Sequence, residues 1–478
     1  MDALVREILN VLGQFNPWWR DEPFTDLPDW RRSAWKELQD WLIKPPARRA
    51  VMLSGARQIG KTTLIMQAIE GLVANGVPPA NIIYATFDHP LLKLAGIDAV
   101  LKAWRLREPR AAGLEYVFLD EAQLISNWGT WIKHQVDFNR QRRIVFTGSA
   151  TPLLEVNQES GVGRWHTIQM TTLSFFEYAR LKQLTLPALP KIGEPGEVLE
   201  QSAGSLQNIR EKAAPYIAHF HEYLMRGGFP QTAQVESIAQ AQRLLREDIV
   251  DRVLKRDMTA LFGVRRVLEL ELTFLYLCMH DGGLLDMPAL CSNLTVKRPT
   301  VQHFIELLEA THLIYKLQPY GYGKEVLRGR CKIHLADAAI APAIMMRGKA
   351  MLDDPTALGV AAETTAFRHL LSRYRSRNAR FSYWRGKEDH EVDLVAEMGG
   401  ELIPFEVKYR SDASNLRQLK GLLELCEAKK LRHGYVITRS PDDIGEVKLT
   451  AGKSKTKIVQ IPAALLCYWM GEVEANGE

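Results

Sequence analysis

The sequence has little cysteine and no long apolar run. Only five cysteines occur in 478 residues, scattered and without the paired spacing of a zinc site or disulfide framework. This usage predicts reduced thiols and a cytoplasmic protein. No uninterrupted apolar stretch approaches the roughly 18 residues of a membrane-spanning helix, so we expect no membrane partner. The N-terminus, with Asp2 and Glu7 in an apolar pattern, lacks the charged and then apolar profile of an export signal.

Neither sign of charge dominates, and there is no internal repeat or low-complexity tract. Lys and Arg number 61 against 56 for Asp and Glu, a formal net charge of +5. That balance permits nucleic-acid binding without demonstrating it. The hydrophobic fraction of 46% and charged fraction of 24% are ordinary globular values, which exclude disordered and fibrous classes. A chain of 478 residues is too long for one ordinary domain.

The order of patterns along the chain predicts an α/β multidomain protein. Short apolar runs at 51–54, 82–87, 116–119 and 144–147 alternate with amphipathic segments, which indicates a parallel sheet covered on both faces. Proline and glycine gather in one later segment, which predicts a linker or insertion. The expected parts are a helical segment 1–45, a P-loop NTPase domain 46–184, the linker or insertion 185–215, a helical and winged-helix-like region 216–350, and a C-terminal α/β domain 351–478.

A glycine-containing loop follows the first apolar run and opens a helical segment. It fits the Walker A pattern, with Gly55, Gly60, Lys61 and Thr62 at the fixed positions. Glycines let backbone N–H groups turn toward phosphate oxygens, and the helix N-terminus adds partial positive charge. Lys61 reaches the β- and γ-phosphates and Thr62 offers a hydroxyl to Mg²⁺, so we expect ATP and Mg²⁺ as cofactors. The predicted nucleotide-binding residues are Gly55, Ala56, Arg57, Gln58, Ile59, Gly60, Lys61, Thr62 and Thr63.

Two acids end the third apolar run, and polar residues end the fourth. Asp120 is placed to hold the Mg²⁺ shell together with Thr62, and Glu121 to polarise the attacking water. Ser149 or Thr147 is a candidate sensor of the γ-phosphate. Capping of the following helix is an equal alternative for these two side chains.

Several arginines are candidates for the group that stabilises charge during hydrolysis. Such an arginine can act in its own chain or be supplied to a neighbouring subunit of a homo-oligomer. The candidates are Arg140, Arg142, Arg143 and Arg164. Arg164, which follows Gly163 ahead of an apolar segment, is the preferred one. A solvated surface role is the alternative for each of them.

A second group of acids lies near the C-terminus. Period-two alternation in 391–395 and 402–408, joined through Gly399 and Gly400, predicts a hairpin that places Asp393 beside Glu406. Adjacent carboxylates repel each other unless a cation lies between them. Hard oxygen ligands favour Mg²⁺ or Mn²⁺, so these two acids are the predicted metal ligands.

Two further side chains complete this predicted site. Lys408 lies on the same strand face as Glu406 and can position a water for attack on a phosphodiester. Glu363 has helical spacing with apolar residues, where a carboxylate is costly unless something compensates it. The four residues together predict a metal-dependent nuclease site. The alternative is an ordinary hairpin with exposed acids and a salt-bridged lysine.

These motifs, with others, resemble a known family over nearly the whole chain. The segments are 55–62, 119–123, 147–150, 173–177, 224–230, 332–337 and the set Glu363, Asp393, Glu406 and Lys408. The sequence is similar to prokaryotic AAA+-type ATPases that carry a C-terminal domain of uncharacterised function related to PD-(D/E)XK nucleases. This resemblance implies ATP binding at Gly60, Lys61 and Thr62, with hydrolysis by Asp120 and Glu121. It also implies a restriction-endonuclease-like α/β fold at the C-terminus.

The middle of the chain contains a predicted helix–turn–helix at 286–309. Extended segments at 313–317 and 332–335 would form a wing, and the resemblance also suggests a winged-helix element. The candidate DNA contacts, early on the second helix, are Lys297, Arg298, Thr300 and His303. The alternative is a module that packs between the domains and touches no DNA.

Together these features predict an ATP-hydrolysing protein that acts on DNA and cuts phosphodiesters with a divalent metal. The alternative is a nucleotide-operated switch whose C-terminal domain binds DNA or a protein partner without cleavage. A third hypothesis, an ATP-dependent protein remodeller, lacks a clear aromatic pore-loop pattern.

Overall fold

The computed structural model describes residues 3–149, 163–323, 326, 329–375, 377–386, 388, 390–410, 419–447 and 456–477. The chain divides into two compact units. The first comprises Met1–Met170 with Ala310–His312, and the second comprises Thr171–Glu309 with Leu313–Glu478. Ala150, the last residue of the motif at 147–150, lies outside the described residues.

The first unit contains a five-stranded parallel sheet with the strand order β2-β3-β4-β1-β5. Its strands are β1 (Ala50–Ser54), β2 (Ile82–Thr86), β3 (Glu115–Asp120), β4 (Arg142–Gly148) and β5 (Trp165–Gln169). The predicted apolar runs form the first four strands, which confirms the parallel sheet. The fifth strand is an edge strand in which Ile168 is buried and the other side chains are half-buried or exposed, so it has no comparable apolar run.

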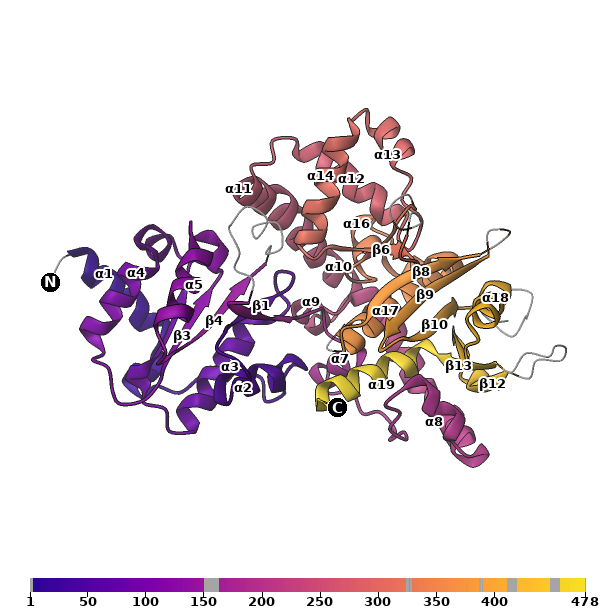
Figure 1. The fold of residues 1–478 in the computed structure, drawn as a ribbon, viewed down its shortest axis with the longest axis horizontal. Coiled ribbons are helices and arrows are strands. Elements are labelled where there is room, and N and C mark those ends of the chain that lie inside the picture. The colour runs from indigo at the N-terminus through magenta and orange to yellow at the C-terminus, as the bar shows by residue number, and fades with distance from the viewer. Residues whose placement is uncertain are drawn as a thin grey trace. The chain divides into compact units, whose positions relative to one another are not determined.

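Helices cover both faces of this sheet (Figure 1). They are α1 (Ala3–Phe15), α2 (Ala34–Ile43), α3 (Lys61–Ala74), α4 (Pro90–Arg107) and α5 (Trp128–Phe138). On one face Leu12, Trp104 and Ile132 pack with alternate strand residues such as Met52 and Val117. The predicted N-terminal helical segment therefore supplies part of the core of the first unit.

The second unit begins with helices. They are α7 (Phe175–Leu181), α8 (Ala203–Arg226), α9 (Pro230–Gln234), α10 (Ile238–Arg246), a π-helical segment (Glu247–Asp257), α11 (Met258–Phe262), α12 (Val267–Met279), α13 (Met287–Leu294) and α14 (Arg298–Ala310). The start of α8 lies within 185–215, which the sequence predicts as a linker or insertion. Ser202 caps this helix by accepting a hydrogen bond from the N–H of Ser205 at 3.1 Å.

The second unit also contains an eight-stranded mixed sheet, with the strand order β12-β13-β11-β10-β9-β8-β6-β7. The strands are β6 (Ile314–Pro319), β7 (Lys332–Leu335), β8 (Arg380–Arg385), β9 (Glu391–Met398), β10 (Glu401–Lys408), β11 (His433–Thr438), β12 (Gly445–Val447) and β13 (Lys457–Pro462). The pairing of β6 with β8 makes the predicted wing strands one edge of the large sheet. One sheet thus crosses the boundary predicted near residue 350.

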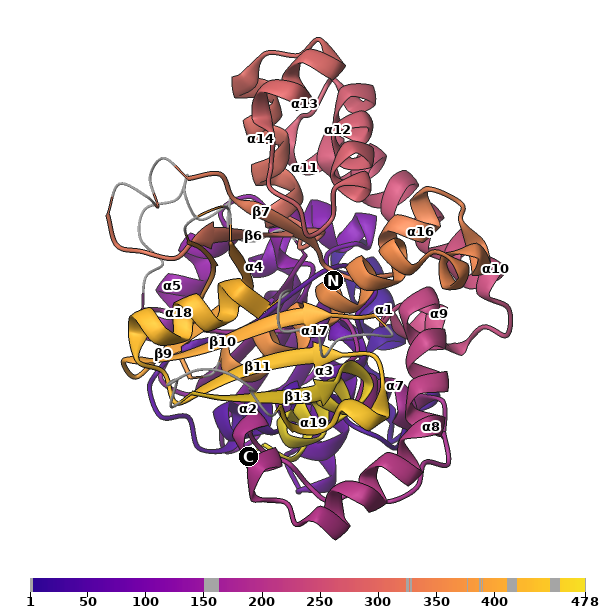
Figure 2. The same ribbon diagram turned by 90° about the vertical axis from the view of Figure 1, so that its right-hand side faces the viewer.

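Helices lie on both faces of the large sheet as well. They are α17 (Pro355–Arg375), α18 (Lys420–Lys429) and α19 (Ala463–Asn476). Helix α16 (Ile340–Ile344) packs against α10 and α12. On one face α18 buries Leu422 and Leu425 with the strand residues Val392 and Val436. On the other face α17 and α19 pack together (Figure 2). Within the described part of the chain, no helix combines the length and apolarity needed to cross a bilayer.

The predicted hairpin near the C-terminus is confirmed. Strands β9 and β10 pair antiparallel, and Gly399 and Gly400 between them have φ values of +59° and +84°. Positive φ at both positions is typical of a tight two-residue turn, which glycine adopts without strain. Because Leu394 pairs with Phe405, the next residues outward, Asp393 and Glu406, lie on neighbouring strands.

Candidate functional site

The loop between β1 and α3 folds tightly around a lysine. A Cβ on Gly55 would lie 2.3 Å from the carbonyl oxygen of Met170, so a side chain there would force the backbone apart. Gly60, with φ +94°, is the N-cap of α3, whose first N–H groups have no acceptor within the helix. The buried Nζ of Lys61 donates to the carbonyl oxygens of Gly55 at 2.8 Å and Ala56 at 2.7 Å. The loop therefore brings an ammonium group and helix N–H groups to one bend.

Asp120, at the end of β3, is the centre of a hydrogen-bond network beside this loop. One carboxylate oxygen accepts from the hydroxyls of Thr62 and Tyr84, each at 2.8 Å. The other accepts from the hydroxyl of Thr147 at 2.5 Å. Thr62, Asp120 and Thr147 meet because the carboxyl ends of parallel strands lie at one edge of the sheet. Thr62 and Asp120 thus offer neighbouring oxygen donors, the kind that Mg²⁺ prefers.

Tyr84 is a member of this network that the sequence analysis misses. Its sequence signal is a hydroxyl in the middle of the mainly apolar run of β2. Burial and then the Asp120 carboxylate raise the pKa of Tyr84 well above its usual value, so it remains a hydrogen-bond donor. Strand β2 is therefore a third element, beside α3 and β4, that donates a hydrogen bond to the Asp120 carboxylate.

Glu121 has a left-handed backbone, with φ +51°, directly after Asp120. Its N–H donates to the hydroxyl of Thr147 at 2.8 Å, and its carboxylate accepts from Gln123 Nε2 and, at 3.3 Å, from Ser149 Oγ. Gln123 Nε2 also donates to Ser149 Oγ at 3.1 Å. Both candidate sensor residues thus contact an acid of the predicted pair, and Gln123, which the sequence analysis also misses, links Ser149 to Glu121.

Two of the candidate arginines, Arg142 and Arg164, pair with acids within the first unit. Arg164 Nε lies 2.8 Å from Asp137 Oδ1, and its side chain is 39% exposed. Arg142 lies 2.7 Å from Glu115, which is nearly fully buried. Arg140 is exposed and Arg143 half-buried. A role for Arg164 in hydrolysis stays a prediction.

Replacing Tyr84 with Phe is expected to lower ATP turnover about tenfold. The change removes one donor from Asp120 and leaves the other two, and a hydrogen bond to a charged group contributes about 1.5–3 kcal/mol. Steady-state phosphate release with saturating ATP measures the effect. Tyr116→Phe, a tyrosine of β3, is the matched control and should keep wild-type turnover. Equal turnover in Tyr84→Phe and wild type would contradict a role for this hydroxyl.

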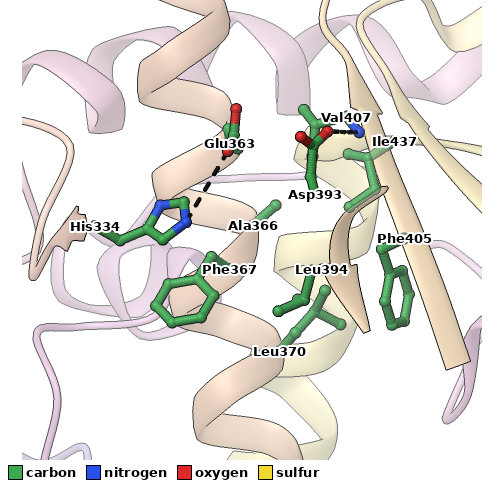
Figure 3. A pocket seen from close by; sticks show the side chains of 10 residues that line it. All are labelled: His334, Glu363, Ala366, Phe367, Leu370, Asp393, Leu394, Phe405, Val407 and Ile437. Atoms are coloured by element: carbon green, nitrogen blue, oxygen red, sulfur yellow. Dashed lines mark hydrogen bonds and ion pairs between the residues drawn. The ribbon is translucent and has the colours of Figure 1, made fainter. Parts of the chain in front are cut away.

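The second candidate site lies where α17, β9 and β10 meet (Figure 3). Glu363 and Asp393 line a cavity of about 10 Å³, room for roughly one water. Asp393 Oδ2 accepts from the N–H of Val407 at 2.9 Å, and Glu406 Oε1 accepts from Lys408 Nζ at 2.5 Å. The structure therefore brings together the four residues that the sequence predicts for a nuclease-type site.

Lys332 of β7 lies among these acids and is missing from the predicted site. Its Nζ is 2.5 Å from Glu391 Oε1, 3.2 Å from Asp393 Oδ1 and 3.8 Å from Glu363 Oε1, and its side chain is only 4% exposed. His334, on the same strand, has its Nε2 4.0 Å from Glu363 Oε1. The available sequence signal is polar residues alternating with apolar ones in 332–335, a strand that is buried throughout.

Burial and neighbouring charges shift the pKa values of these acids in opposite directions. Burial and then the Asp393 carboxylate raise the pKa of Glu363 well above its usual value, and the same causes raise the pKa of Glu406 to about 8. Burial also disfavours ionised Asp393, but Lys332, Lys408 and the N–H of Val407 together lower the pKa of Asp393. Near neutral pH the ammonium groups of Lys332 and Lys408 therefore face an ionised Asp393, while Glu363 and Glu406 favour the protonated form.

A divalent cation does not fit this arrangement. One oxygen each of Glu391 and Asp393 is paired with Lys332, and one oxygen of Glu406 is paired with Lys408. The second oxygen of Asp393 accepts from a backbone N–H. Among the residues that the structure describes, no three His, Cys, Asp or Glu side chains are grouped as metal ligands. Glu363 Oε1 and Glu406 Oε2 are buried without a hydrogen-bond partner in that same set, which costs less for a neutral carboxyl than for a carboxylate. Metal ligation by Asp393 and Glu406 gains no support.

The candidate DNA contacts lie at the start of α14. The preceding helix α13 is capped by Asp286, whose Oδ1 accepts from the N–H of Ala289 at 2.9 Å. Lys297, Arg298 and His303 are exposed and Thr300 is half-buried. Their contact with DNA and the winged-helix assignment stay predictions.

Three of the motif segments meet around Arg368 in α17, within the second unit. Arg368 Nη2 donates to the carbonyl oxygen of Leu173 at 3.1 Å and also contacts the hydroxyl of Tyr223. The N–H of Leu173 donates to Gly228 O at 2.7 Å, and the N–H of Gly228 donates to Asp337 Oδ2 at 2.8 Å. A Cβ on Gly228 would lie 2.6 Å from Leu173 O, which explains the glycine. The segments 173–177, 224–230 and 332–337 therefore owe their sequences at least in part to packing.

Comparison with protein families supports the assignment of the first unit. Residues 47–179 match the family described as "AAA domain". Residues 217–351 match "Domain of unknown function (DUF8612)" and residues 358–459 match "Domain of unknown function (DUF4143)". The AAA match contains the five-stranded sheet and the glycine loop, so the chain carries a P-loop ATPase domain of the AAA type. The C-terminal match names no function and gives the nuclease assignment no support.

Curated relatives match most of the chain. An uncharacterised protein of Haemophilus influenzae is 26% identical over 79% of this chain and 87% of its own length. An uncharacterised protein of Mycobacterium tuberculosis is 25% identical, covering 85% of this chain and 80% of its own. One of Methanocaldococcus jannaschii is 22% identical, covering 84% and 83%.

Solved structures are similar only at low levels. A Thermotoga maritima protein related to the DNA polymerase III gamma subunit is 14% identical, with TM-score 0.26 over 58% of this chain and 97% of that one. The replication initiator DnaA bound to AMPPCP and single-stranded DNA is 16% identical, with TM-score 0.24 over 59% and 89%. The S. cerevisiae Hsp104–ADP complex is 13% identical, with TM-score 0.29 over 73% and 46%.

Proposed function

We propose that the protein binds Mg²⁺–ATP at residues 55–63, hydrolyses it, and acts as a nucleotide-operated switch on DNA. The observation that carries this proposal is the network around Asp120. It joins the Thr62 hydroxyl of the loop to Thr147 at the end of the neighbouring strand. A phosphate group bound in the loop would therefore directly affect the residues that end β3 and β4.

Each residue of the site has a distinct part in this proposal. Lys61 and the loop N–H groups bind the phosphates, while Thr62 and Asp120 hold Mg²⁺. The metal ion, when bound, neutralises charge on the β- and γ-phosphates. Glu121 orients the attacking water, with Thr147 and Ser149 as sensors. Arg164, or an arginine of a neighbouring copy in a homo-oligomer, stabilises the developing charge.

The remaining parts of the chain serve as the responding elements. Lys297, Arg298 and His303 are exposed on one end of α14, where they suit contact with DNA phosphates. All five cysteines are free thiols, which suits a cytoplasmic protein. The C-terminal sheet binds DNA or a protein partner without cutting it, because its acids are already paired with lysines.

A second candidate function is a divalent-metal-dependent deoxyribonuclease. The observation in its favour is the convergence of Glu363, Asp393, Glu406 and Lys408 at one place in the fold. The observation against it is Lys332, whose ammonium group lies among the acids. The two candidates differ in whether a phosphodiester is cut.

One set of assays tests both candidates. Lys61→Ala removes the lysine contact to the phosphates and is expected to lower ATP turnover by about 10²-fold or more, by analogy with losing one preorganised electrostatic donor. Plasmid and linear DNA are incubated with wild type, Lys61→Ala and Asp393→Ala, with Mg²⁺ or Mn²⁺ and with or without ATP. Binding without any cut product supports the switch. Cleavage that Asp393→Ala abolishes supports the nuclease, and wild-type hydrolysis by Lys61→Ala would overturn the ATP site.

A further inference from the structure

Lys332 occupies the position at which several carboxylates of the second unit converge. One oxygen from each of Glu391, Asp393 and Glu363 lies 2.5, 3.2 and 3.8 Å from its Nζ. The acids come from two different elements, β9 and α17, and the lysine comes from a third, β7. An ammonium group has three donors, so it can pair with three acceptors at once.

The surroundings make this lysine a fixed part of the cluster rather than a surface side chain. Its side chain is 4% exposed, against 19% for Glu363, 29% for Glu391 and 16% for Asp393. Strand β7 is buried along its whole length, and the Lys332 backbone pairs with Leu317 of β6. A buried ammonium group is costly unless it is paired, and here the pairing is with several acids at once.

A divalent cation at this place would have to displace the ammonium group. Two cations a few ångströms apart repel each other strongly in a partly desolvated site. The second oxygen of Asp393 accepts from the N–H of Val407 at 2.9 Å, and Glu406 Oε1 is paired with Lys408. Donors of the protein itself therefore already occupy both oxygens of Asp393 and one oxygen of Glu406.

We infer that Lys332 is the resident cation of this acidic cluster, and that its ammonium group takes the place of a divalent metal ion in the wild-type protein. The cluster then holds β7 and β9 together by ion pairing, with Glu363 of α17 beside them, and binds neither Mg²⁺ nor Mn²⁺. It becomes a site for a divalent cation only when the lysine charge is removed. This inference concerns the second unit and does not depend on ATP hydrolysis by the first.

Mn²⁺ binding to the nucleotide-free full-length protein, followed by electron paramagnetic resonance, tests the inference. Wild type and Asp393→Asn are expected to bind the same amount of Mn²⁺, because the wild-type cluster takes none. Lys332→Met is expected to bind one additional Mn²⁺ per chain, with at least tenfold higher affinity than any wild-type site. Lys316→Met is the matched control, since Lys316 on β6 pairs at 2.5 Å with the single acid Glu309, and it should gain no Mn²⁺.

Two results would overturn the inference. One is a Mn²⁺ ion bound by wild type and lost in Asp393→Asn, which would show that the lysine leaves room for a metal. The other is a folded Lys332→Met that gains no Mn²⁺. If Lys332→Met does not fold, the comparison of wild type with Asp393→Asn still decides the question. Because both proteins contain the same P-loop, metal binding there cancels in the comparison, and a failed ATPase assignment would leave this result unchanged.

Discussion

Replacing Glu121 with Gln is expected to lower ATP turnover by about 10³-fold and to leave ATP binding nearly unchanged. A positioned general base contributes about 10²–10⁴-fold, and the amide keeps the size of the side chain while losing its basicity. Glu121 is fixed for such a role, because its N–H bonds to Thr147 and its carboxylate is held by Gln123 and Ser149. Single-turnover phosphate release measures the loss, and a fluorescent ATP analogue measures binding.

The control for this change is Glu70→Gln. Glu70 is a half-exposed residue of α3 in the same unit, paired with Arg31 at 3.0 Å, and its replacement should leave turnover within about twofold of wild type. Loss of ATP binding in Glu121→Gln would mean that this carboxylate supports the fold of the loop. Turnover close to wild type would remove Glu121 from the hydrolytic step.

The nucleotide site could be predicted from the sequence because its parts are local. The loop depends on glycines at fixed spacing within one strand–loop–helix segment, and the two acids follow directly after an apolar strand. The rule that parallel strands bring their carboxyl ends to one edge then places Thr62, Asp120 and Thr147 together without knowledge of the register. The C-terminal hairpin is local for the same reason, since two glycines define its turn.

The residues missed by the sequence analysis depend on contacts between distant segments. Lys332 meets Asp393 only because β6 pairs with β8 and thereby attaches β7 to the C-terminal sheet. Strand pairing of this kind is decided by the packing of the whole sheet, so a helical region and a C-terminal domain looked separable in the sequence. Tyr84 is similar, because its contact with Asp120 spans two strands.

The motif segments near Arg368 show that a recognisable sequence motif can serve packing rather than catalysis. Gly228 is fixed by its approach to the carbonyl of Leu173, and Asp337 accepts the N–H of Gly228. His369, next to Arg368, accepts the N–H of Phe175 at 2.9 Å. These contacts hold residues 171–177, the segment that begins the second unit, against α8 and α17. We therefore attribute the segments to stability of the second unit.

Replacing Arg368 with Ala is expected to lower the local stability of residues 171–177, in the second unit, by about 3–5 kcal/mol. The buried guanidinium donates to the carbonyl oxygens of Thr172 at 2.9 Å and Leu173 at 3.1 Å. Thr172 O still accepts from the Thr171 hydroxyl and Leu173 O from the Tyr223 hydroxyl, so neither carbonyl loses every donor. The loss comes from two hydrogen bonds to a charged donor, about 1.5–3 kcal/mol each, and from the emptied volume. Hydrogen-exchange mass spectrometry should show protection falling by about 10²–10³-fold, since 1.4 kcal/mol corresponds to about tenfold.

Two further variants separate the hydrogen bonds from the charge. Arg368→Lys keeps the charge but loses the planar fork that reaches two carbonyl oxygens, so its loss of protection should be intermediate. Arg243→Ala, an arginine of α10 that is 74% exposed and paired with Glu247 at 2.8 Å, should change stability by no more than about 0.5 kcal/mol. Unchanged protection of 171–177 in Arg368→Ala would mean that packing of α7 and α8 holds this segment without the guanidinium.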